Sequence, residues 1–367
     1  MIIKSIELSN FRNYEQLHIN FEEGTNILYG DNAQGKTNIL EAIYLSGTTK
    51  SHRGTKDKDI IQFGEDESHV RLHLTKHDVK HRVDMHLRKN KTKGVAINGQ
   101  SIKKSGDLFG IAHMIFFSPE DLSIIKNGPA ERRRFMNLEL CQLNKLYYHN
   151  YVNYNKALNQ RNTLLKQIYY QPELKDTLDM WDMYLMEYGK CIIEQREEFI
   201  HDLNEIVKGI HSHLTGKKES IEIGYEKNVT VEDYGKIMLS KREMDLRYQS
   251  TQVGPHRDDI CFYINGIDVR KFGSQGQQRT AALSLKLAEI ELVKTIIHDT
   301  PILLLDDVMS ELDSNRKNYL LDSMKDVQTI VTCTGYDDFI KSRLQINQIY
   351  KVTNGTVELL TMKELGG

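Results

Sequence analysis

Residues Gly30-Asp31-Asn32-Ala33-Gln34-Gly35-Lys36-Thr37 (GDNAQGKT) decide the fold class, because they match the phosphate-binding pattern G-x-x-x-x-G-K-S/T in full. Glycines at both ends let backbone N–H groups turn inward around phosphates. The lysine supplies positive charge to the β- and γ-phosphates, and the threonine hydroxyl is a ligand for Mg²⁺. We therefore predict that all eight residues contact ATP and that Lys36 also has a catalytic role.

The flanks of this loop support that prediction. Residues 25–29 read as a strand that runs into the loop, and residues from Lys36 to about Ser46 carry apolar side chains at helical spacing. A phosphate loop needs this strand, loop and helix order to aim its amides at the ligand. A glycine-rich loop that matched the pattern by chance would not be expected to have this order of elements.

Composition indicates a globular protein with two lobes. The chain has 367 residues, 39% hydrophobic and 27% charged, with a net charge of −2, and exceeds the usual length of one domain. This charge does not by itself indicate nucleic-acid binding, so local basic clusters must carry any such claim. The four cysteines are widely spaced, and no run is apolar enough to cross a membrane. We expect a cytoplasmic protein with reduced thiols and no membrane association.

The pattern along the chain predicts an α/β fold with an inserted helical lobe. We expect an ATPase core lobe from residues 1–117 and 246–367, with a mixed sheet around the phosphate-loop helix and an antiparallel β subdomain. Residues 118–245 should form the inserted, mainly helical lobe, which leads to the segment at Ser274. Its apolar spacing is too irregular for a long coiled coil, and Pro172 predicts a helix break.

Two further segments carry candidate chemistry. Residues 302–307 (ILLLDD) read as a buried strand that ends in two carboxylates, where Asp306 would hold Mg²⁺ and Asp307 would act as the catalytic base. Residues 273–279 (GSQGQQR) open a predicted helix, whose free N–H groups form a second phosphate-binding surface or, alternatively, only a capped helix start. Ser274, Gly276 and Gln277 are its candidate nucleotide contacts.

The ordered set of motifs resembles the ATP-binding head of ABC and SMC ATPases, and in particular the RecF family of bacterial recombination-mediator ATPases. Residues 310–313 (SELD) add a D-loop-like segment in which Asp313 is a further candidate nucleotide contact. The resemblance spans nearly the whole chain and rests also on FRNY (11–14), SHR (51–53), FSPEDL (117–122), RRRF (132–135) and GPHRDD (254–259).

The resemblance implies a function in recombinational repair and replication-gap processing. ATP with Mg²⁺ would close a homodimer on duplex and gapped or single-stranded DNA, with Ser274 of one protomer facing Lys36 of the other. It implies cooperation with RecR and RecO in recombinase loading, and a part in SOS induction. Asp307 stands where transporters carry a longer glutamate, and residues 331–334 lack the usual transporter histidine. We therefore expect a weak, DNA-dependent ATPase that works as a switch.

A basic hairpin is the leading candidate for DNA contact. Residues 76–93 hold seven lysines and arginines against two aspartates. Such a face suits phosphate contacts, although a solvated strand face is about equally plausible. The candidate contacts from this hairpin and from the loop after the first helix are Arg53, Lys56, Arg88, Lys89, Lys91 and Lys93. DNA contact is also conceivable for the arginines 132–134, but a structural role, pairing with carboxylates across the interface between the two lobes, is favoured.

Two other functions are weighed against repair. An ABC transporter nucleotide-binding subunit would need a membrane partner, a coupling glutamine loop and the missing histidine. A GTP-dependent switch would need an N-K-x-D motif, which the sequence lacks. Both absences favour the repair ATPase.

Overall fold

The computed structural model describes residues 1–335 and 346–360, and the chain divides into two compact units. The first unit comprises residues 1–121 and 289–367, and the second comprises residues 122–288. The second unit thus runs much further than the expected limit at residue 245. The reason is that the strands between residues 221 and 268 pair with one another in a sheet of their own, separate from the two six-stranded sheets.

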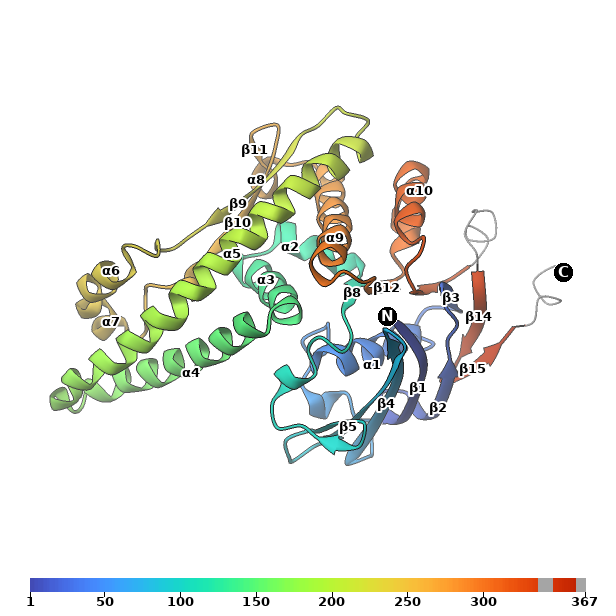
Figure 1. The fold of residues 1–367 in the computed structure, drawn as a ribbon, viewed down its shortest axis with the longest axis horizontal. Coiled ribbons are helices and arrows are strands. Elements are labelled where there is room, and N and C mark those ends of the chain that lie inside the picture. Colours follow the sequence, from blue (N-terminus) through green and yellow to red (C-terminus); the bar gives the residue numbers. More distant parts are fainter. Residues whose placement is uncertain (336–345, 361–367) are drawn as a thin grey trace. The chain divides into compact units, whose positions relative to one another are not determined.

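An antiparallel sheet forms one layer of the first unit, in the strand order β2-β1-β4-β5-β6-β7 (Figure 1). Its side chains alternate between core and solvent, as in β4, where Val70, Leu72 and Leu74 are buried. A tight hairpin turn at Asn98-Gly99, with φ of 52° and 83°, joins the last two strands of this sheet. The strands are β1 (Ile2–Phe11), β2 (Tyr14–Asn20), β4 (Glu67–Lys76), β5 (Val79–Arg88), β6 (Gly94–Ile97) and β7 (Gln100–Ser101).

The second layer of this unit is a mainly parallel sheet in the order β15-β14-β3-β13-β12-β8. Only β15 runs antiparallel to its neighbour. The central strands are almost wholly apolar and buried, as expected for a sheet covered on both faces. The strands are β3 (Thr25–Tyr29), β8 (Met114–Phe117), β12 (Ile302–Asp306), β13 (Thr329–Cys333), β14 (Ile346–Thr353) and β15 (Thr356–Leu359).

Helix α1 (Lys36–Thr48) contacts strands of both sheets, and its buried face forms a common core with them. Ile39, Leu40 and Ile43 are fully buried, which confirms the apolar spacing that predicted this helix. The helix starts directly after the phosphate loop, so the core fixes the direction of its first turn. Helix α10 (Ser314–Ser323) and the short η1 (Asp57–Asp59), η2 (Ser105–Asp107), η3 (Pro119–Asp121) and η6 (Val308–Glu311) complete this unit.

The second unit is mainly helical, as predicted. Helices α4 (Lys145–Ile168) and α5 (Leu178–Leu214) pack side by side as a hairpin (Figure 1), and η4 (Pro172–Thr177) lies in the predicted break between them. A three-stranded sheet, β11-β10-β9, packs against α5. The other elements are α2 (Leu122–Lys126), α3 (Pro129–Leu143), β9 (Ile221–Glu226), α6 (Tyr234–Ser240), α7 (Arg242–Tyr248), η5 (Pro255–Arg257), β10 (Asp259–Ile264), β11 (Ile267–Asp268), α8 (Val269–Phe272) and α9 (Gln275–Ile297), which continues into the first unit.

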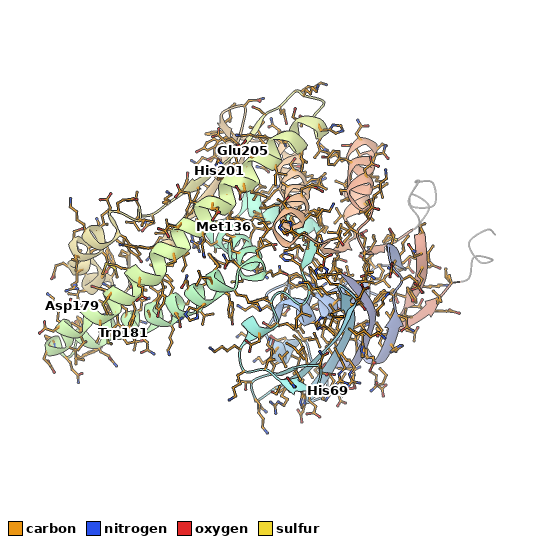
Figure 2. The ribbon with its side chains drawn as sticks, in the orientation of Figure 1. His69, Met136, Asp179, Trp181, His201 and Glu205 are labelled. Carbon is orange, nitrogen blue, oxygen red and sulfur yellow. The ribbon has the colours of Figure 1, made fainter. Side chains whose placement is uncertain are left out.

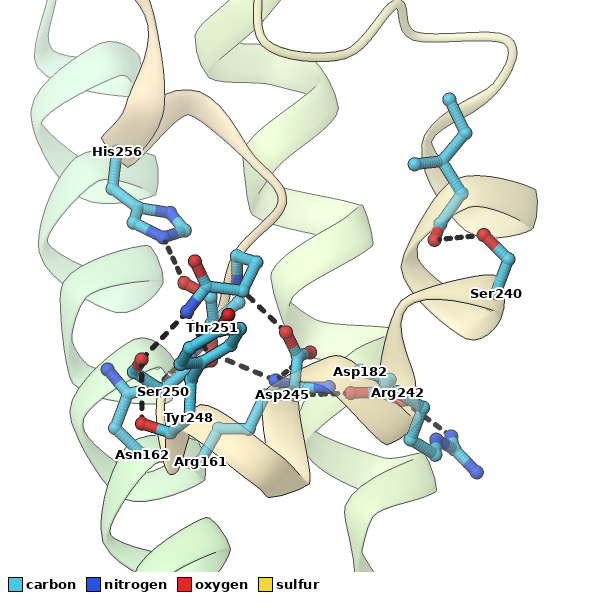
Figure 3. A network of polar contacts seen from close by, with 12 residues as sticks. Arg161, Asn162, Asp182, Ser240, Arg242, Asp245, Tyr248, Ser250, Thr251 and His256 are labelled. Atoms are coloured by element: carbon cyan, nitrogen blue, oxygen red, sulfur yellow. Dashed lines mark hydrogen bonds and ion pairs between the residues drawn. The ribbon is translucent and has the colours of Figure 1, made fainter.

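A buried ionic network joins the helices of the second unit (Figure 3). The fully buried guanidinium of Arg161 on α4 donates to Asp182 on α5 at 2.5 Å and lies 2.7 Å from Asp245 on α7. Arg242 adds a second positive charge, 2.5 Å from Asp182. The positive charges of the two arginines thus lie next to the negative charges of Asp182 and Asp245. This pairing offsets the free-energy cost of removing the charges from water. None of the helices in the described ranges is long and apolar enough to cross a membrane.

Candidate nucleotide-binding site

The phosphate loop joins β3 to α1, and its two glycines have conformations that other residues rarely adopt. Gly35 has φ of 110°, and a Cβ there would lie 2.5 Å from the Asn13 Nδ2 atom. Gly30 has φ of 154°, and a Cβ there would lie 2.3 Å from the Val352 carbonyl oxygen. Side chains at these positions would therefore push the loop away from its supports.

Lys36 is held inside the loop by the loop's own backbone. Its ammonium donates to the Gly30 carbonyl at 2.6 Å and to the Asp31 carbonyl at 2.7 Å, and the side chain is almost completely buried. Burial lowers the pKa of Lys36, and the negative charges of Asp307, Asp306 and Asp31 only partly oppose this effect. A further anion beside this amine would favour its charged form.

Asp306 ends β12 beside the start of α1. One of its oxygens, Oδ1, accepts from the Thr37 hydroxyl at 2.7 Å and from the Thr332 hydroxyl at 2.7 Å. Thr332 lies on β13, directly opposite Asp306 in the parallel pairing. A hydroxyl and a carboxylate at this separation are oxygen ligands of the kind that Mg²⁺ prefers, so Thr37 and Asp306 fit the predicted metal ligands.

Asp307 adopts a left-handed backbone conformation, with φ of 51°. Its N–H donates to the Thr332 carbonyl at 3.3 Å and to the Thr332 hydroxyl at 3.0 Å. This conformation is sparsely populated by residues other than glycine, and it often marks functional positions. Asp307 contributes to the same cavity as the phosphate loop.

A cavity of about 460 Å³ opens over these residues within the first unit. Loop residues 32–37 line it together with Asp306, Asp307 and Thr332. The remaining lining comes from segments whose place in a site the sequence did not reveal: Asn38, His52, Arg53, Ser118, Pro119 and Glu120. The SHR and FSPEDL stretches supported the family resemblance, but their spacing alone gave no indication that they border the phosphate loop.

The FRNY segment stabilises the phosphate loop through hydrogen bonds of Asn13. Asn13 donates from Nδ2 to the Gln34 carbonyl at 3.2 Å and accepts from Asn38 at 2.8 Å. On the other side, the Gln34 side chain accepts from the Asn354 N–H at 2.6 Å, in the β14–β15 turn. Two segments that are distant from the loop in sequence therefore hold it in its curved conformation.

A buried carboxylate on α1 ties the SHR segment to the same helix. Glu41 is fully buried and forms a bidentate pair with Arg12, at 2.8 and 2.9 Å, and Ser51 donates to it at 2.5 Å. Burial alone would raise the pKa of Glu41, but the hydrogen bonds from Arg12 and Ser51 and the Arg12 charge outweigh it, so its pKa lies below the usual value. This ionised group anchors the residues before Arg53 at the cavity.

Residues 273–279 (GSQGQQR), which we call the signature segment, begin α9 in the second unit with a reciprocal capping arrangement. Gln277 N–H donates to the Ser274 hydroxyl at 3.2 Å, and Ser274 N–H donates to the Gln277 side-chain oxygen at 2.9 Å. Gln277 also donates to Glu219 at 2.9 Å. Ser274 and Gly276 are exposed, so the capped helix start presents its first turn to solvent.

Asp313 has a capping role as well. Its carboxylate accepts from the N–H groups of Asn315 and Arg316, both at 3.1 Å, at the start of α10, and it pairs with the Arg316 guanidinium at 2.8 Å. The side chain is nonetheless exposed. Its expected contact with nucleotide remains a prediction.

The predicted DNA-contact residues fall into two groups. Lys56, Lys89 and Lys91 are exposed, and Lys89 lies 3.3 Å from Asp66. Lys93 and Arg88 are more restrained, because Lys93 pairs with Asp57 at 3.0 Å and also donates to the Thr49 carbonyl, while Arg88 donates to the Thr92 carbonyl at 2.8 Å.

Arg53 lies at the nucleotide cavity as well as on the surface. Its guanidinium donates to the Asn38 side chain at 3.4 Å and lies 3.8 Å from Glu41. This position at the cavity was not expected from the sequence, which suggested DNA contact alone. A guanidinium there is equally able to meet a phosphate of a nucleotide.

Arg132 of the RRRF segment pairs with a carboxylate, as favoured from the sequence, but the pair lies within the second unit and not across the interface between lobes. The Arg132 side chain is almost completely buried and forms a bidentate pair with Asp259 of the GPHRDD segment, at 2.6 and 2.9 Å. Its neighbour Asp258 is fully buried, accepts from Arg196 at 3.0 Å and also bonds Tyr225. These carboxylates hold the second unit together.

The sheet around the phosphate loop, the apolar strand ending in Asp306 and Asp307, and the helical second unit define an ABC-type ATPase head. The chain belongs to the RecF family. A family model described as RecF/RecN/SMC N terminal domain matches residues 2–358. Curated relatives named DNA replication and repair protein RecF include one from Agathobacter rectalis, 61% identical over 98% of this chain and 99% of its own length. One from Clostridium botulinum (strain ATCC 19397 / Type A) is 45% identical over 98% and 100%.

Solved structures agree with this membership. The structure of the recombination mediator protein RecF with ATP in the RecFOR pathway matches with a TM-score of 0.90 and 37% identity, over 98% of both chains. An SMC head bound to the C-winged helix domain of ScpA matches with a TM-score of 0.58 at 15% identity, which indicates a shared fold alone. Membership in this family favours a repair ATPase over a transporter subunit.

Proposed function

We propose that this protein is an ATP-dependent DNA-binding ATPase of recombinational repair and replication-gap processing. The observation that carries this proposal is the cavity over residues 32–37, which brings Lys36, Asp306 and Asp307 together within one unit. The RecF relatives named for DNA replication and repair, and the relative solved with ATP, support the choice of nucleotide and process.

In the proposed site, the loop amides and Lys36 bind the β- and γ-phosphates. Mg²⁺, when bound, would neutralise developing negative charge on the phosphates, held by Thr37 and Asp306. Thr332 keeps the Asp306 carboxylate aligned through its 2.7 Å hydrogen bond. Asp307 orients the attacking water, and its short side chain holds that water less closely than a glutamate would, so hydrolysis is slow.

We further propose that ATP joins two copies of the chain. The exposed first turn of α9, with Ser274 and Gly276, would close over the γ-phosphate bound by the partner, using its free N–H groups and helix dipole. Asp313 would lie at the same junction. ATP then stabilises the dimer by binding both protomers at once, and hydrolysis releases it.

The proposed dimer grips DNA through phosphate contacts from Arg53, Lys56, Arg88, Lys89, Lys91 and Lys93. Backbone contacts of this kind recognise duplex, gapped and single-stranded regions without reading sequence, and their affinity falls with salt. RecR and RecO are the proposed partners in recombinase loading, with a downstream role in SOS induction. The RecFOR pathway named for a solved relative supports this choice.

The test is a measurement of protomer association by light scattering, with ATP and duplex DNA added separately and together. We expect dimers only with ATP, tighter DNA binding by the ATP form, and neither effect with Lys36→Met. Turnover of ATP should be slow and should rise when DNA is added. If ATP leaves both the mass and the DNA affinity unchanged, the dimer and clamp proposal is wrong.

A matched pair of variants tests the DNA-contact residues. Replacing the exposed Lys89 and Lys91 with alanine should weaken binding of any sequence and reduce the salt slope, by roughly one for each phosphate that is no longer neutralised. The control replaces the exposed Lys217 and Lys218, which lie outside the proposed surface. Equal affinity and equal salt slope for both pairs would show that Lys89 and Lys91 do not contact DNA.

A further inference from the structure

Three metal-binding side chains gather on the outer face of the antiparallel sheet. Glu67 and His69 are two residues apart on β4, so they project from the same face. His86 on β5 is the direct cross-strand partner of His69. Figure 2 labels His69 on this sheet. Within residues 1–335 and 346–360, this is the one group of three or more such side chains whose ligand atoms all lie within 4.8 Å of one another.

The three side chains are already close to a common point. His86 Nε2 lies 2.8 Å from a Glu67 carboxylate oxygen, and His69 Nε2 lies 3.8 Å from the other oxygen. The two imidazole rings stack with centroids 4.2 Å apart and planes 21° from parallel. One ring nitrogen of each histidine and a Glu67 carboxylate oxygen all lie within 4.8 Å of one another.

We propose that Glu67, His69 and His86 form a binding site for one divalent transition-metal ion of the zinc class. Two imidazoles and one carboxylate are a ligand set that Zn²⁺ accepts with a fourth position left for water. Ligand atoms about 2.0–2.1 Å from a tetrahedral ion lie roughly 3.4 Å from each other. This distance lies between the 2.8 Å from His86 to Glu67 and the 3.8 Å from His69 to Glu67. Because the side chains are partly exposed, small rotations suffice to reach that geometry.

The nearby positive charges are bound elsewhere, so they oppose a cation only weakly. Arg71, on the same face of β4, pairs with Asp84 at 2.6 Å and with Glu7 at 3.4 Å. Arg88, the cross-strand neighbour of Glu67, donates to the Thr92 carbonyl at 2.8 Å. The carboxylates of Asp84 and Glu7 thus offset the charge of Arg71, whereas Arg88 keeps its charge but is held by the Thr92 carbonyl.

The site also has access to solvent. His69 and His86 line a hollow of about 660 Å³ on this face, together with Glu7, His18 and Arg71. A metal held by three protein ligands here could therefore keep a water or accept a small anion. This inference is independent of the proposed ATPase function, since none of these residues lines the nucleotide cavity.

The same face provides a matched control group. Glu7, His18 and His73 are also two histidines and one glutamate, and both histidines lie near the Glu7 carboxylate, at 3.9 and 3.8 Å. The described residues nevertheless contain no second group that meets the mutual 4.8 Å limit. Loss of His18 or His73 should therefore leave metal affinity unchanged.

The experiment is titration of the tag-free, chelator-treated full chain with ZnCl₂ by calorimetry, without nucleotide, and with CoCl₂ by visible absorption. We expect one tight ion per chain, and His69→Ala or His86→Ala should weaken it at least about tenfold, since even outer-shell changes reach that size. Glu67→Gln should weaken it as well, whereas His18→Ala and His73→Ala should not.

Circular dichroism and the zinc-dependent rise in melting temperature show whether each variant is folded. The rise should vanish in the His69→Ala/His86→Ala double variant while the metal-free melting temperature stays within the range of the control variants. Wild-type zinc affinity in that double variant, or several equivalent ions per chain, would overturn the proposal.

Discussion

Glu41 links α1 to the loops around the nucleotide cavity through its carboxylate. It faces Arg12, Ser51 and Thr55 from a fully buried position. Arg12 and Ser51 come from the FRNY and SHR stretches, and Thr55 lies two residues after SHR, so the contact cannot be recognised from sequence spacing. The local sequence around Glu41 reads only as an amphipathic helix, in which a glutamate is usually exposed.

We predict that Glu41→Gln lowers the free energy of unfolding by about 3 kcal/mol, because it leaves Arg12 without its paired charge. Urea unfolding followed by circular dichroism measures this. Glu65→Gln is the control, because Glu65 is exposed and makes a single hydrogen bond to Asn10. A loss no larger than in the control would contradict a structural role for the Arg12–Glu41 pair.

The same pair should make stability depend on pH in a known direction. The pKa of Glu41 is lower in the folded protein than its usual value, so the folded state binds its proton less readily than the unfolded chain. Its contribution is present above the unfolded pKa of about 4.3 and is lost as pH falls through the folded pKa. The stability difference between wild type and Glu41→Gln should thus shrink below about pH 4.3. A difference that grows on acidification would refute this sign.

At the scale of elements, the start of α9 combines a structural and a proposed functional role. The Ser274 and Gln277 pair caps the helix, so a simple Ser274→Ala change would cost about 1 kcal/mol and confuse the two roles. Aspartate caps helices as well as serine does, but it adds a negative charge.

We therefore predict that Ser274→Asp keeps the melting temperature of the wild type but abolishes ATP-dependent dimers, since its carboxylate would repel the γ-phosphate bound by the partner. Thermal unfolding and light scattering give the two readouts. Ser274→Asn is the control, because it caps the helix without the charge. Dimers of normal stability in Ser274→Asp would mean that this segment does not close over the nucleotide.

The elements also differ in how well sequence predicts them. The phosphate loop, α1 and the turn at Asn98-Gly99 follow from local rules, since backbone conformation and apolar spacing fix them. The pairing of the strands β9 and β10 does not follow from local rules. Pairing depends on contacts between distant residues, and here β9 and β10 pair with each other and pack on α5.

At the scale of the whole molecule, the proposed function requires two chains, because the loop with Lys36 and the segment with Ser274 would serve different nucleotides. We predict that mixing Lys36→Met and Ser274→Asp proteins restores ATP hydrolysis above that of either variant alone. Each mixed dimer would contain one site built from an intact loop and an intact signature. The measurement is the steady-state rate at constant total protein, and a rate equal to the mean of the two variants would rule out shared sites.

The amino-acid sequence by itself determined the ATPase class, the loop residues 30–37 and the Asp306–Asp307 pair, because phosphate binding demands fixed residue types at fixed spacing. It also determined the helical nature of residues 129–214, through apolar periodicity. The tertiary structure alone decided that Asn13, His52, Arg53 and Thr332 meet at or beside the loop, and that the second unit extends to residue 288. Those outcomes depend on which distant segments pack together, and short-range sequence patterns do not determine that packing.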